Sequence, residues 1–215
     1  MSSPLGKVLA AAARGSFPPP DGSVTVLPQP AARDVGVVSF TCHAVVFADV
    51  EPSWVRERIS PGDLAGPLAP PFLTALGART GREANNVDMV TVAEALPGPP
   101  PLELVETADT GHPRVVRALR HRDDVRAWTT PDGGTLVIGR GVAGRWEMSF
   151  EVADSGRGRG LGRGLARAAR HLIPADEVLW AQVAPGNARS VRAVLAAGFL
   201  PVGAEVLMVP PGGRG

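Results

Sequence analysis

The chain has 215 residues, and its 22 Lys and Arg residues against 21 Asp and Glu residues give a formal net charge of +1. This balance excludes a bulk polyanion binder and a strongly acidic surface. Hydrophobic residues make up 44% of the chain, so it can bury a core, whereas its 26 glycines and 22 prolines predict many turns.

The chain contains a single cysteine, Cys42, so it cannot close an intramolecular disulfide. No set of Cys and His residues has the spacing of a zinc site, which predicts that no metal is bound. The apolar run over 8–13 is too short for a secretory signal or a membrane span. We therefore expect a cytoplasmic protein with no membrane partner.

Residues 1–35 are expected to form an N-terminal arm, because a weak helical pattern there is followed by three consecutive prolines. Residues 36–112 are expected to supply the N-terminal part of a sheet and the acceptor-side helices, either within one enlarged domain or as a separate partner domain. The patterns predict one long or two short strands over 37–50, helices over 52–59 and 72–79, and a strand over 86–93.

The signals are clearer in residues 113–215. Two strand-like runs flank the turn at Pro131, Asp132 and Gly133, and a third run over 145–152 alternates strictly between apolar even positions and polar odd positions. Further patterns predict a helix over 161–172, a strand over 177–184, a helix over 188–197 with Asn187 as its N-cap, and strand structure over 199–209. The fold class is therefore α/β (α+β).

A glycine-rich loop lies between the strand over 145–152 and the following helix. Glycines allow tight turns, so backbone N–H groups and the positive end of the helix dipole can converge on an anion, and a phosphate is the expected ligand. A Walker A loop is excluded because its lysine is missing: the only lysine is Lys7. A Rossmann fingerprint fails in both registers, since Arg163 or Leu165 occupies the position that needs Gly or Ala.

Two linked motifs carry a resemblance to a known family. The loop fits the pattern R-x-x-G-x-G, and downstream Asn187 and Ser190 are followed by the pair Gly198 and Phe199. In this order and spacing, from Trp128 to Leu207, the chain resembles the GNAT superfamily of acyl-CoA-dependent N-acetyltransferases. The loop motif consists of Arg157, Gly158, Arg159, Gly160, Leu161 and Gly162.

The resemblance implies a mixed, mostly antiparallel central sheet with a splayed strand pair and flanking helices, enlarged by an N-terminal segment, and an acetyl-CoA-binding core over 113–215. By the same resemblance, residues 157–162 bind the CoA pyrophosphate. The main chain of Phe150 and Val152 holds the pantetheine and faces the thioester carbonyl, and Asn187 and Ser190 line the pantetheine arm. Acetyl-CoA is thus the expected cosubstrate, and the expected activity is acetyl transfer to an amine.

One position departs from the family pattern. Members often have a tyrosine seven residues after the Asn, as general acid toward the leaving thiolate, but here that position is Val194, and the chain contains no tyrosine. Two functions therefore stay open. The chain is an N-acetyltransferase that uses proximity, water or another donor, or it is a catalytically weak or inactive acyl-CoA-binding regulatory module.

The predicted general bases are Glu147 and Glu151, which lie beside the expected carbonyl site; His43 and His121 are weaker candidates. Residues 1–112 carry a net charge of −5 and residues 113–215 carry +6. This asymmetry suits a cationic amine, either a small molecule or a peptide, and an anionic cofactor. The basic stretch over 156–170 lacks interleaved aromatic residues, so no nucleic-acid partner is expected. The oligomeric state stays open, with a homodimer as one alternative.

Overall fold

The computed structural model describes residues 3–213 and divides into two compact units. The first unit contains the residues up to Val90 and those from Val202 onward, and the second runs from Thr91 to Pro201. The expected boundary at 112/113 differs from this division, which falls after Val90, within strand β4 (Glu83–Glu94).

The first unit combines a small sheet with helices. Its neighbouring strands follow the order β1-β3-β2-β10, in which β1 and β3 are parallel and the other pairs are antiparallel. The elements are α1 (Pro4–Ala13), β1 (Val24–Leu27), β2 (Gly36–Phe40), β3 (His43–Phe47), α2 (Pro52–Arg56), η1 (Gly66–Leu68), α3 (Pro70–Thr80), the first part of β4, and most of β10 (Leu200–Val209).

The expected N-terminal arm is partly a packed element. Helix α1 buries Leu5 and Leu9, and β1 adds a parallel strand beside β3. Helix α3 confirms the predicted second helix; it ends at Gly81, whose left-handed backbone (φ 67°) closes the last turn. In the core of this unit, Leu76 of α3 belongs to one apolar cluster with Val46 of β3 and Val206 of β10. Apolar packing therefore holds the sheet and α3 together.

The second unit contains the strands in the order β4-β9-β8-β7-β6-β5. Strands β5 to β8 pair antiparallel in succession, and β8 and β9 are parallel. Its elements are the end of β4, β5 (Val105–Thr107), α4 (Pro113–His121), β6 (Asp123–Thr129), β7 (Gly134–Arg140), η2 (Val142–Gly144), β8 (Trp146–Val152), η3 (Asp154–Gly156), α5 (Leu161–Ala169), β9 (Val178–Val183) and α6 (Ala188–Ala196).

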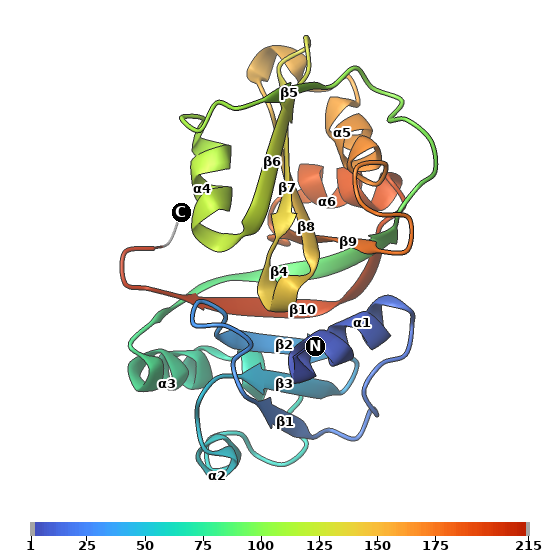
Figure 1. Cartoon of the computed structure of the whole chain (residues 1–215). Helices are drawn as coiled ribbons and strands as arrows, with labels where there is room; N and C mark the ends of the chain where they lie inside the picture. The colour runs from blue at the N-terminus through green and yellow to red at the C-terminus, as the bar shows by residue number, and fades with distance from the viewer. Residues whose placement is uncertain (1–2, 214–215) are drawn as a thin grey trace. The chain divides into compact units, whose positions relative to one another are not determined.

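Helices cover the two faces of the strands β6 to β8, with α4 on one side and α5 and α6 on the other (Figure 1). Val115 and Ala118 of α4 pack against Ala127 and Val137, which are register partners on β6 and β7. On the opposite face, the fully buried Leu165 of α5 lies close to Gly134. The odd positions of β8 therefore face α4, and its even positions face α5.

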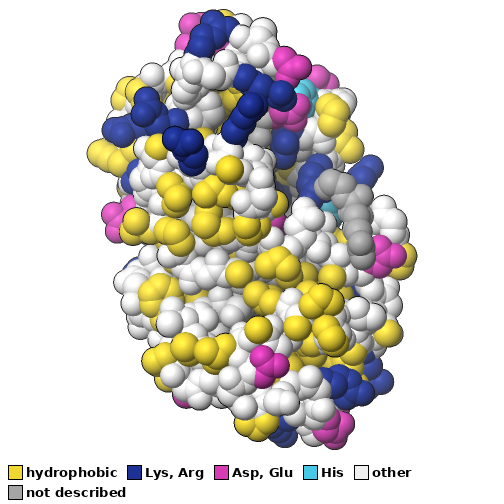
Figure 2. Space-filling model, turned by 180° about the vertical axis from the view of Figure 1, so that it is seen from behind, with side chains coloured by type: hydrophobic (Ala, Val, Ile, Leu, Met, Phe, Trp, Pro, Cys, Tyr) yellow, Lys and Arg dark blue, Asp and Glu magenta, His cyan; other side chains and the backbone are white. Residues whose placement is uncertain are grey.

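The predicted fold class is confirmed, because the structure is mixed, its strand pairs are mostly antiparallel, and helices flank the sheet. The expected strand structure over 37–50 is two short strands, β2 and β3. On the face shown in Figure 2, basic side chains lie in separate groups, several of them beside acidic ones, and not as one continuous field.

Candidate functional site

The centre of the candidate site is a fork between β8 and β9. Strand β8 pairs with β7 along its whole length, from Trp146 to Val152, but with β9 only at Trp146 and Glu147. Beyond these two residue pairs the parallel ladder ends, so residues 148–152 of β8 have no strand partner on the β9 side. This is the splayed strand pair that the resemblance implied.

The main-chain groups of β8 that face the fork can be assigned from the ladder. The Gly141 N–H donates to Arg145 O, and the Ala153 N–H donates to Gly133 O, both at 2.9 Å. Because hydrogen-bonding direction alternates along an antiparallel strand, the odd positions of β8 bond to β7 and the even positions point to the other side. The N–H and C=O groups of Phe150 and Val152 are therefore directed into the fork.

The predicted glycine loop follows β8 after the single turn of η3. Gly158 and Gly160 both adopt φ 80°, a left-handed conformation that favours glycine, and Gly160 is the N-cap of α5. No side chain caps this helix, so the first N–H groups of α5 keep their hydrogen-bonding capacity. An uncapped helix N-terminus with left-handed glycines before it suits an anion.

The glycines of the motif serve two different purposes. An added Cβ would meet nothing within 4 Å at Gly158 and only the Arg163 Nη2 atom, at 3.9 Å, at Gly160. At Gly162, in contrast, a Cβ would lie 3.2 Å from the Phe150 ring. The first two positions thus have open space beside the backbone, whereas Gly162 lets α5 pack closely on β8.

The two arginines of the motif are folded back onto their own loop. Arg157 forms an ion pair with Asp154 at 2.6 Å, and its Nε donates to Val152 O at 3.4 Å. Arg159 donates through Nη2 to Ser155 O. Both arginines are exposed, and in this conformation their side chains brace the loop.

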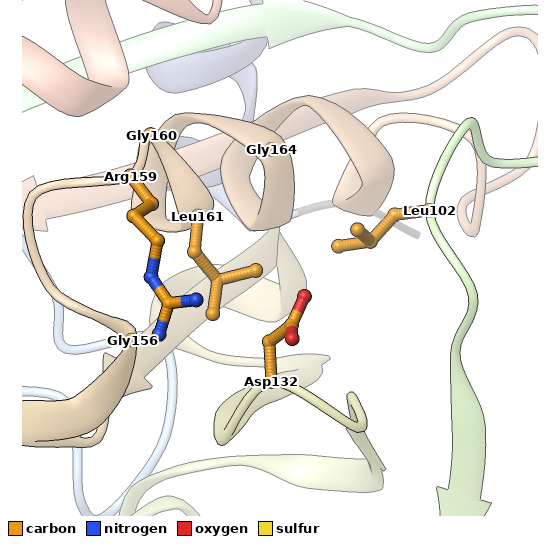
Figure 3. A pocket seen from close by; sticks show the side chains of 7 residues that line it. All are labelled: Leu102, Asp132, Gly156, Arg159, Gly160, Leu161 and Gly164. Carbon is orange, nitrogen blue, oxygen red and sulfur yellow. The ribbon is translucent and has the colours of Figure 1, made fainter.

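A pocket of about 210 Å³ lies beside this loop (Figure 3). The side chains of Leu102, Asp132, Arg159 and Leu161 reach into it from different segments of the second unit. Because ligand pockets usually measure about 300–1,000 Å³, this space suits one part of a larger ligand. The remaining lining residues are Gly156, Gly160 and Gly164.

The second motif is placed on α6. Asn187 is the N-cap of this helix and accepts a hydrogen bond from the Ser190 N–H at 3.1 Å, as predicted from the sequence. Asn187 is exposed and Ser190 is half-buried. Val194 is 1% exposed, so the position where the family often has a tyrosine is here an apolar part of the core.

Glu147 lies in a buried network of charges. Its Oε1 accepts hydrogen bonds from Arg145 Nε at 2.8 Å, Gln182 Nε2 at 2.9 Å and the Val142 N–H at 3.2 Å. Its Oε2 accepts from Arg122 Nε at 3.1 Å. The carboxylate is 4% exposed, so its acceptor sites are occupied by protein groups.

The pKa of Glu147 follows from this environment. Burial has the largest influence and raises the pKa, but the charges of Arg145 and Arg122 and the hydrogen bonds to the carboxylate together lower it below its ordinary value. A carboxylate with a low pKa and four donors is a weak proton acceptor. The catalytic role of Glu147 stays a prediction, and the geometry around it is that of a structural ion pair.

The other predicted bases differ in their surroundings. Glu151 is exposed, and its Oε2 lies 3.4 Å from Arg114 Nη2. His121 is the last residue of α4 and is half-buried; burial, followed by the charges of neighbouring arginines, lowers its pKa. His43 belongs to the first unit, where its ring contacts Asp21 and Thr25, both at 3.0 Å.

Arg122 lies at the fork, and no sequence motif points to it. With 21 arginines in the chain, no single arginine stands out by composition. Arg122 follows α4 directly, and α4 itself was not predicted. The position of Arg122 beside β8 depends on tertiary structure, since Glu147 is 25 residues away along the chain.

No family model and no curated protein matches the chain. Among solved structures, it is similar to a GNAT-family acetyltransferase from Colwellia psychrerythraea, with a TM-score of 0.39 and 10% identity, over 63% of this chain and 60% of that one. It is also similar to a GCN5-related N-acetyltransferase from Kribbella flavida, with a TM-score of 0.43 and 19% identity, over 64% and 63%.

The chain thus spans less than two thirds of the length of each of these structures. Within residues 3–213, no helix has both the length and the apolar character needed to cross a bilayer. The same residues contain no group of three or more His, Cys, Asp or Glu side chains that could hold a metal ion. Both solved structures bear the name of the family that the two sequence motifs resemble, the GNAT N-acetyltransferases.

Proposed function

We propose that the chain is a GNAT-type N-acetyltransferase that moves an acetyl group from acetyl-CoA to an amine. The observation that carries this proposal is the continuity between two features. The open main-chain edge of β8 at Phe150 and Val152 leads directly into the uncapped, glycine-flanked N-terminus of α5. A ligand with a diphosphate at one end and an extended amide-containing arm fits this combination.

In this proposal acetyl-CoA lies in one direction along β8. The diphosphate accepts N–H groups of residues 157–162, and the pantetheine arm follows β8 backwards past Val152 and Phe150. The acetyl end then lies toward Met148, where the fork closes. Along β8, the distance from Val152 to Met148 is four residue steps, or about 13 Å, and the arm follows this length. Asn187 and Ser190 border the arm from α6.

The reaction itself is a direct displacement. The neutral amine nitrogen attacks the thioester carbonyl carbon, the N–C bond forms, and the carbonyl electron pair moves onto oxygen. The C–S bond then breaks, and CoA leaves as a thiolate. A main-chain N–H of β8 on the open edge stabilises the oxygen as its charge develops.

The proton of the amine needs an acceptor. Glu151 is exposed and next to Phe150, so it is our first candidate for the base. His121 is the second candidate, because its lowered pKa keeps its ring neutral near pH 7. Glu147 is less suitable, since four protein donors already occupy its oxygens. The thiolate takes its proton from water, because Val194 supplies no hydroxyl.

A regulatory acyl-CoA-binding module is the second candidate function, favoured by the apolar Val194 alone. Both functions require acetyl-CoA binding, but only the enzyme releases CoA thiol in the presence of an amine. We propose a small-molecule or peptide amine as the acceptor. The cationic character expected from the charge of residues 1–112 is tested with matched cationic, neutral and anionic amines.

Calorimetry with acetyl-CoA, followed by thiol release with this panel of amines, tests the proposal. We expect binding in the micromolar range and thiol release that depends on the amine. Binding without release for any amine supports the regulatory module. Absence of acetyl-CoA binding refutes both functions, because both depend on the fork and the glycine loop.

A further inference from the structure

The side chain of Arg122 occupies the closed end of the fork. Arg122 follows α4 in an extended conformation (φ −137°, ψ 151°), which directs it away from the helix and toward β8. Its Nε donates to Glu147 Oε2 at 3.1 Å, its Nη1 to Ser149 Oγ at 3.2 Å and its Nη2 to Met148 O at 3.3 Å. Three donors of one guanidinium thus bind three consecutive residues of β8.

The contact with Met148 explains why the fork opens where it does. Met148 is an even position, so its C=O points toward β9, and a continued parallel ladder would pair it with the main-chain N–H of Gln182. The ladder instead ends at Glu147 and Trp180. Arg122 takes the Met148 carbonyl, and the Gln182 side chain binds Glu147. The guanidinium therefore takes the place of the β9 main-chain donor that a continued ladder would supply to Met148.

Arg122 brings a buried positive charge to this point. Its side chain is 10% exposed, and together with Arg145 it surrounds the single carboxylate of Glu147, so the three groups carry a net charge of +1. Burial lowers the pKa of Arg122, while Glu147 opposes that shift. A guanidinium nevertheless remains protonated in proteins.

The guanidinium of Arg122 has more N–H groups than its hydrogen bonds use. It carries five N–H groups, and within residues 3–213 its hydrogen bonds use three of them. The two others belong to Nη1 and Nη2, the nitrogens that already lie beside Ser149 and Met148. Phe150, the next even position along β8, follows Ser149 directly, and its main-chain groups face the same fork.

We propose that Arg122 is a catalytic residue that donates to the thioester oxygen of the bound acyl group and stabilises its negative charge during transfer. This inference rests on the proposed function, in which the acyl end of acetyl-CoA lies toward Met148. As the amine nitrogen bonds to the carbonyl carbon, the electron pair of the C=O bond moves onto oxygen. The guanidinium then donates a hydrogen bond to this negatively charged oxygen. The pair returns when the C–S bond breaks, and the thiolate leaves beside the same positive charge.

The missing tyrosine would act as general acid toward the leaving thiolate, and in this proposal the positive charge of Arg122 stabilises that thiolate until water protonates it. Position 194 is a buried valine, so α6 offers no donor there. A fixed cation in a site with little water stabilises developing charge more strongly than a donor in solution does. Glu147 is then a positioning residue, because it holds the guanidinium by its Nε.

Three variants test the role of Arg122. Arg122→Met keeps the length of the side chain without charge, and Arg122→Lys keeps charge without the planar fork of donors. Arg126→Met is the matched control, because Arg126 is exposed and its contacts, the ion pair with Glu106 and the Trp128 ring at 4.8 Å, involve only β5 and β6. We expect Arg122→Met to lower kcat by about 10²–10³-fold, as for the loss of one oxyanion donor, with the acetyl-CoA Kd changed by less than about threefold. Arg122→Lys should recover part of kcat, and the control should match the wild type.

A spectroscopic measurement distinguishes catalysis from structural support. The carbonyl stretch of ¹³C-labelled acetyl-CoA should move to lower frequency on binding to the wild type, because a charged donor polarises the C=O bond. That displacement should be lost in Arg122→Met and kept in Arg126→Met. Glu147 keeps its ion pair with Arg145 in Arg122→Met, so no buried charge is left unpaired, and thermal unfolding without ligand checks that this variant folds.

The outcomes separate this inference from the proposed function. If the wild type does not bind acetyl-CoA or transfer its acetyl group, the proposed function fails. If the wild type is active but its bound thioester band stays at the solution frequency, the role of Arg122 is refuted without any variant. Parallel losses of kcat and binding, both restored in Arg122→Lys, would also refute it and leave Arg122 as a structural support of the fork.

Discussion

The glycine loop provides the sharpest test of cofactor binding, through Gly160→Ala. Gly160 has φ 80° and ψ 3°, and an alanine in this left-handed region costs about 1–2 kcal/mol. The reduced flexibility of the unfolded chain offsets about 0.4–1 kcal/mol of this cost. Because the added Cβ meets only Arg163 Nη2 at 3.9 Å, no clash within the protein adds to it. We expect a net loss of about 1 kcal/mol, or about 2–4 °C in Tm.

Acetyl-CoA binding should suffer far more than stability. The methyl group stands in the space where the diphosphate approaches the backbone, so at least one charged N–H contact is lost. Such a contact is worth about 1.5–3 kcal/mol, which corresponds to about 10- to 150-fold in Kd. Calorimetry with acetyl-CoA measures this change, and thermal unfolding without ligand measures the stability.

Gly62→Ala is the matched control for the backbone effect. Gly62 is also exposed, has φ 78°, and has no atom within 4 Å of an added Cβ. Its stability loss should equal that of Gly160→Ala, whereas its acetyl-CoA affinity should equal that of the wild type. Equal Kd values in the two variants would show that the diphosphate does not contact the backbone at Gly160.

Three further outcomes test other parts of the reasoning. If His121 is the base, its lowered pKa places an acid limb of kcat below pH 6.5, and His121→Gln should remove that limb. Hydrogen bonds to Ser23 lower the pKa of Asp21 from 3.8 to about 2. Its contribution to stability is therefore complete above pH 3.8 and is lost as the pH falls toward 2. Denaturant unfolding of Asp21→Asn should not show this pH-dependent loss. Leu165→Ala should cost about 2–5 kcal/mol in denaturant unfolding, and Leu195→Ala, at an exposed position, less than about 0.5.

The local features of the site could be predicted from the sequence because their causes lie within a few residues. The left-handed turns at Gly158 and Gly160 require glycine whatever packs around them, and the N-cap at Asn187 needs only the Ser190 N–H three residues later. The alternation of β8 likewise depends on neighbouring positions alone. Such features are visible in any sequence window that contains them.

The two missed elements differ in what the sequence contains. Strand β1 has four residues, all half-buried, and it is stabilised by pairing with β3, a tertiary contact that a single sequence does not contain. Helix α4 does have a local pattern, because Pro113 begins it and Val115 and Ala118, three positions apart, form its buried face. This pattern indicates a helix, so α4 could have been predicted. The sequence does not show that this face packs on Ala127 and Val137.

The two glutamates of β8 show where periodicity alone is insufficient. Alternation correctly places Glu147 and Glu151 on one face, and it assigns them the same chemical role. Their partners make them different: Glu147 is held by Arg122 and Gln182, which lie 25 and 35 residues away along the chain, whereas Glu151 meets Arg114 at the surface. Burial raises the pKa of Glu147, but the charges of Arg145 and Arg122 lower it below its ordinary value. Its oxygens are held by these partners, so this residue is suited to hold a cation in place. Proton transfer on that face of β8 is therefore better assigned to Glu151, and a loss of activity in Glu147→Gln would arise through Arg122.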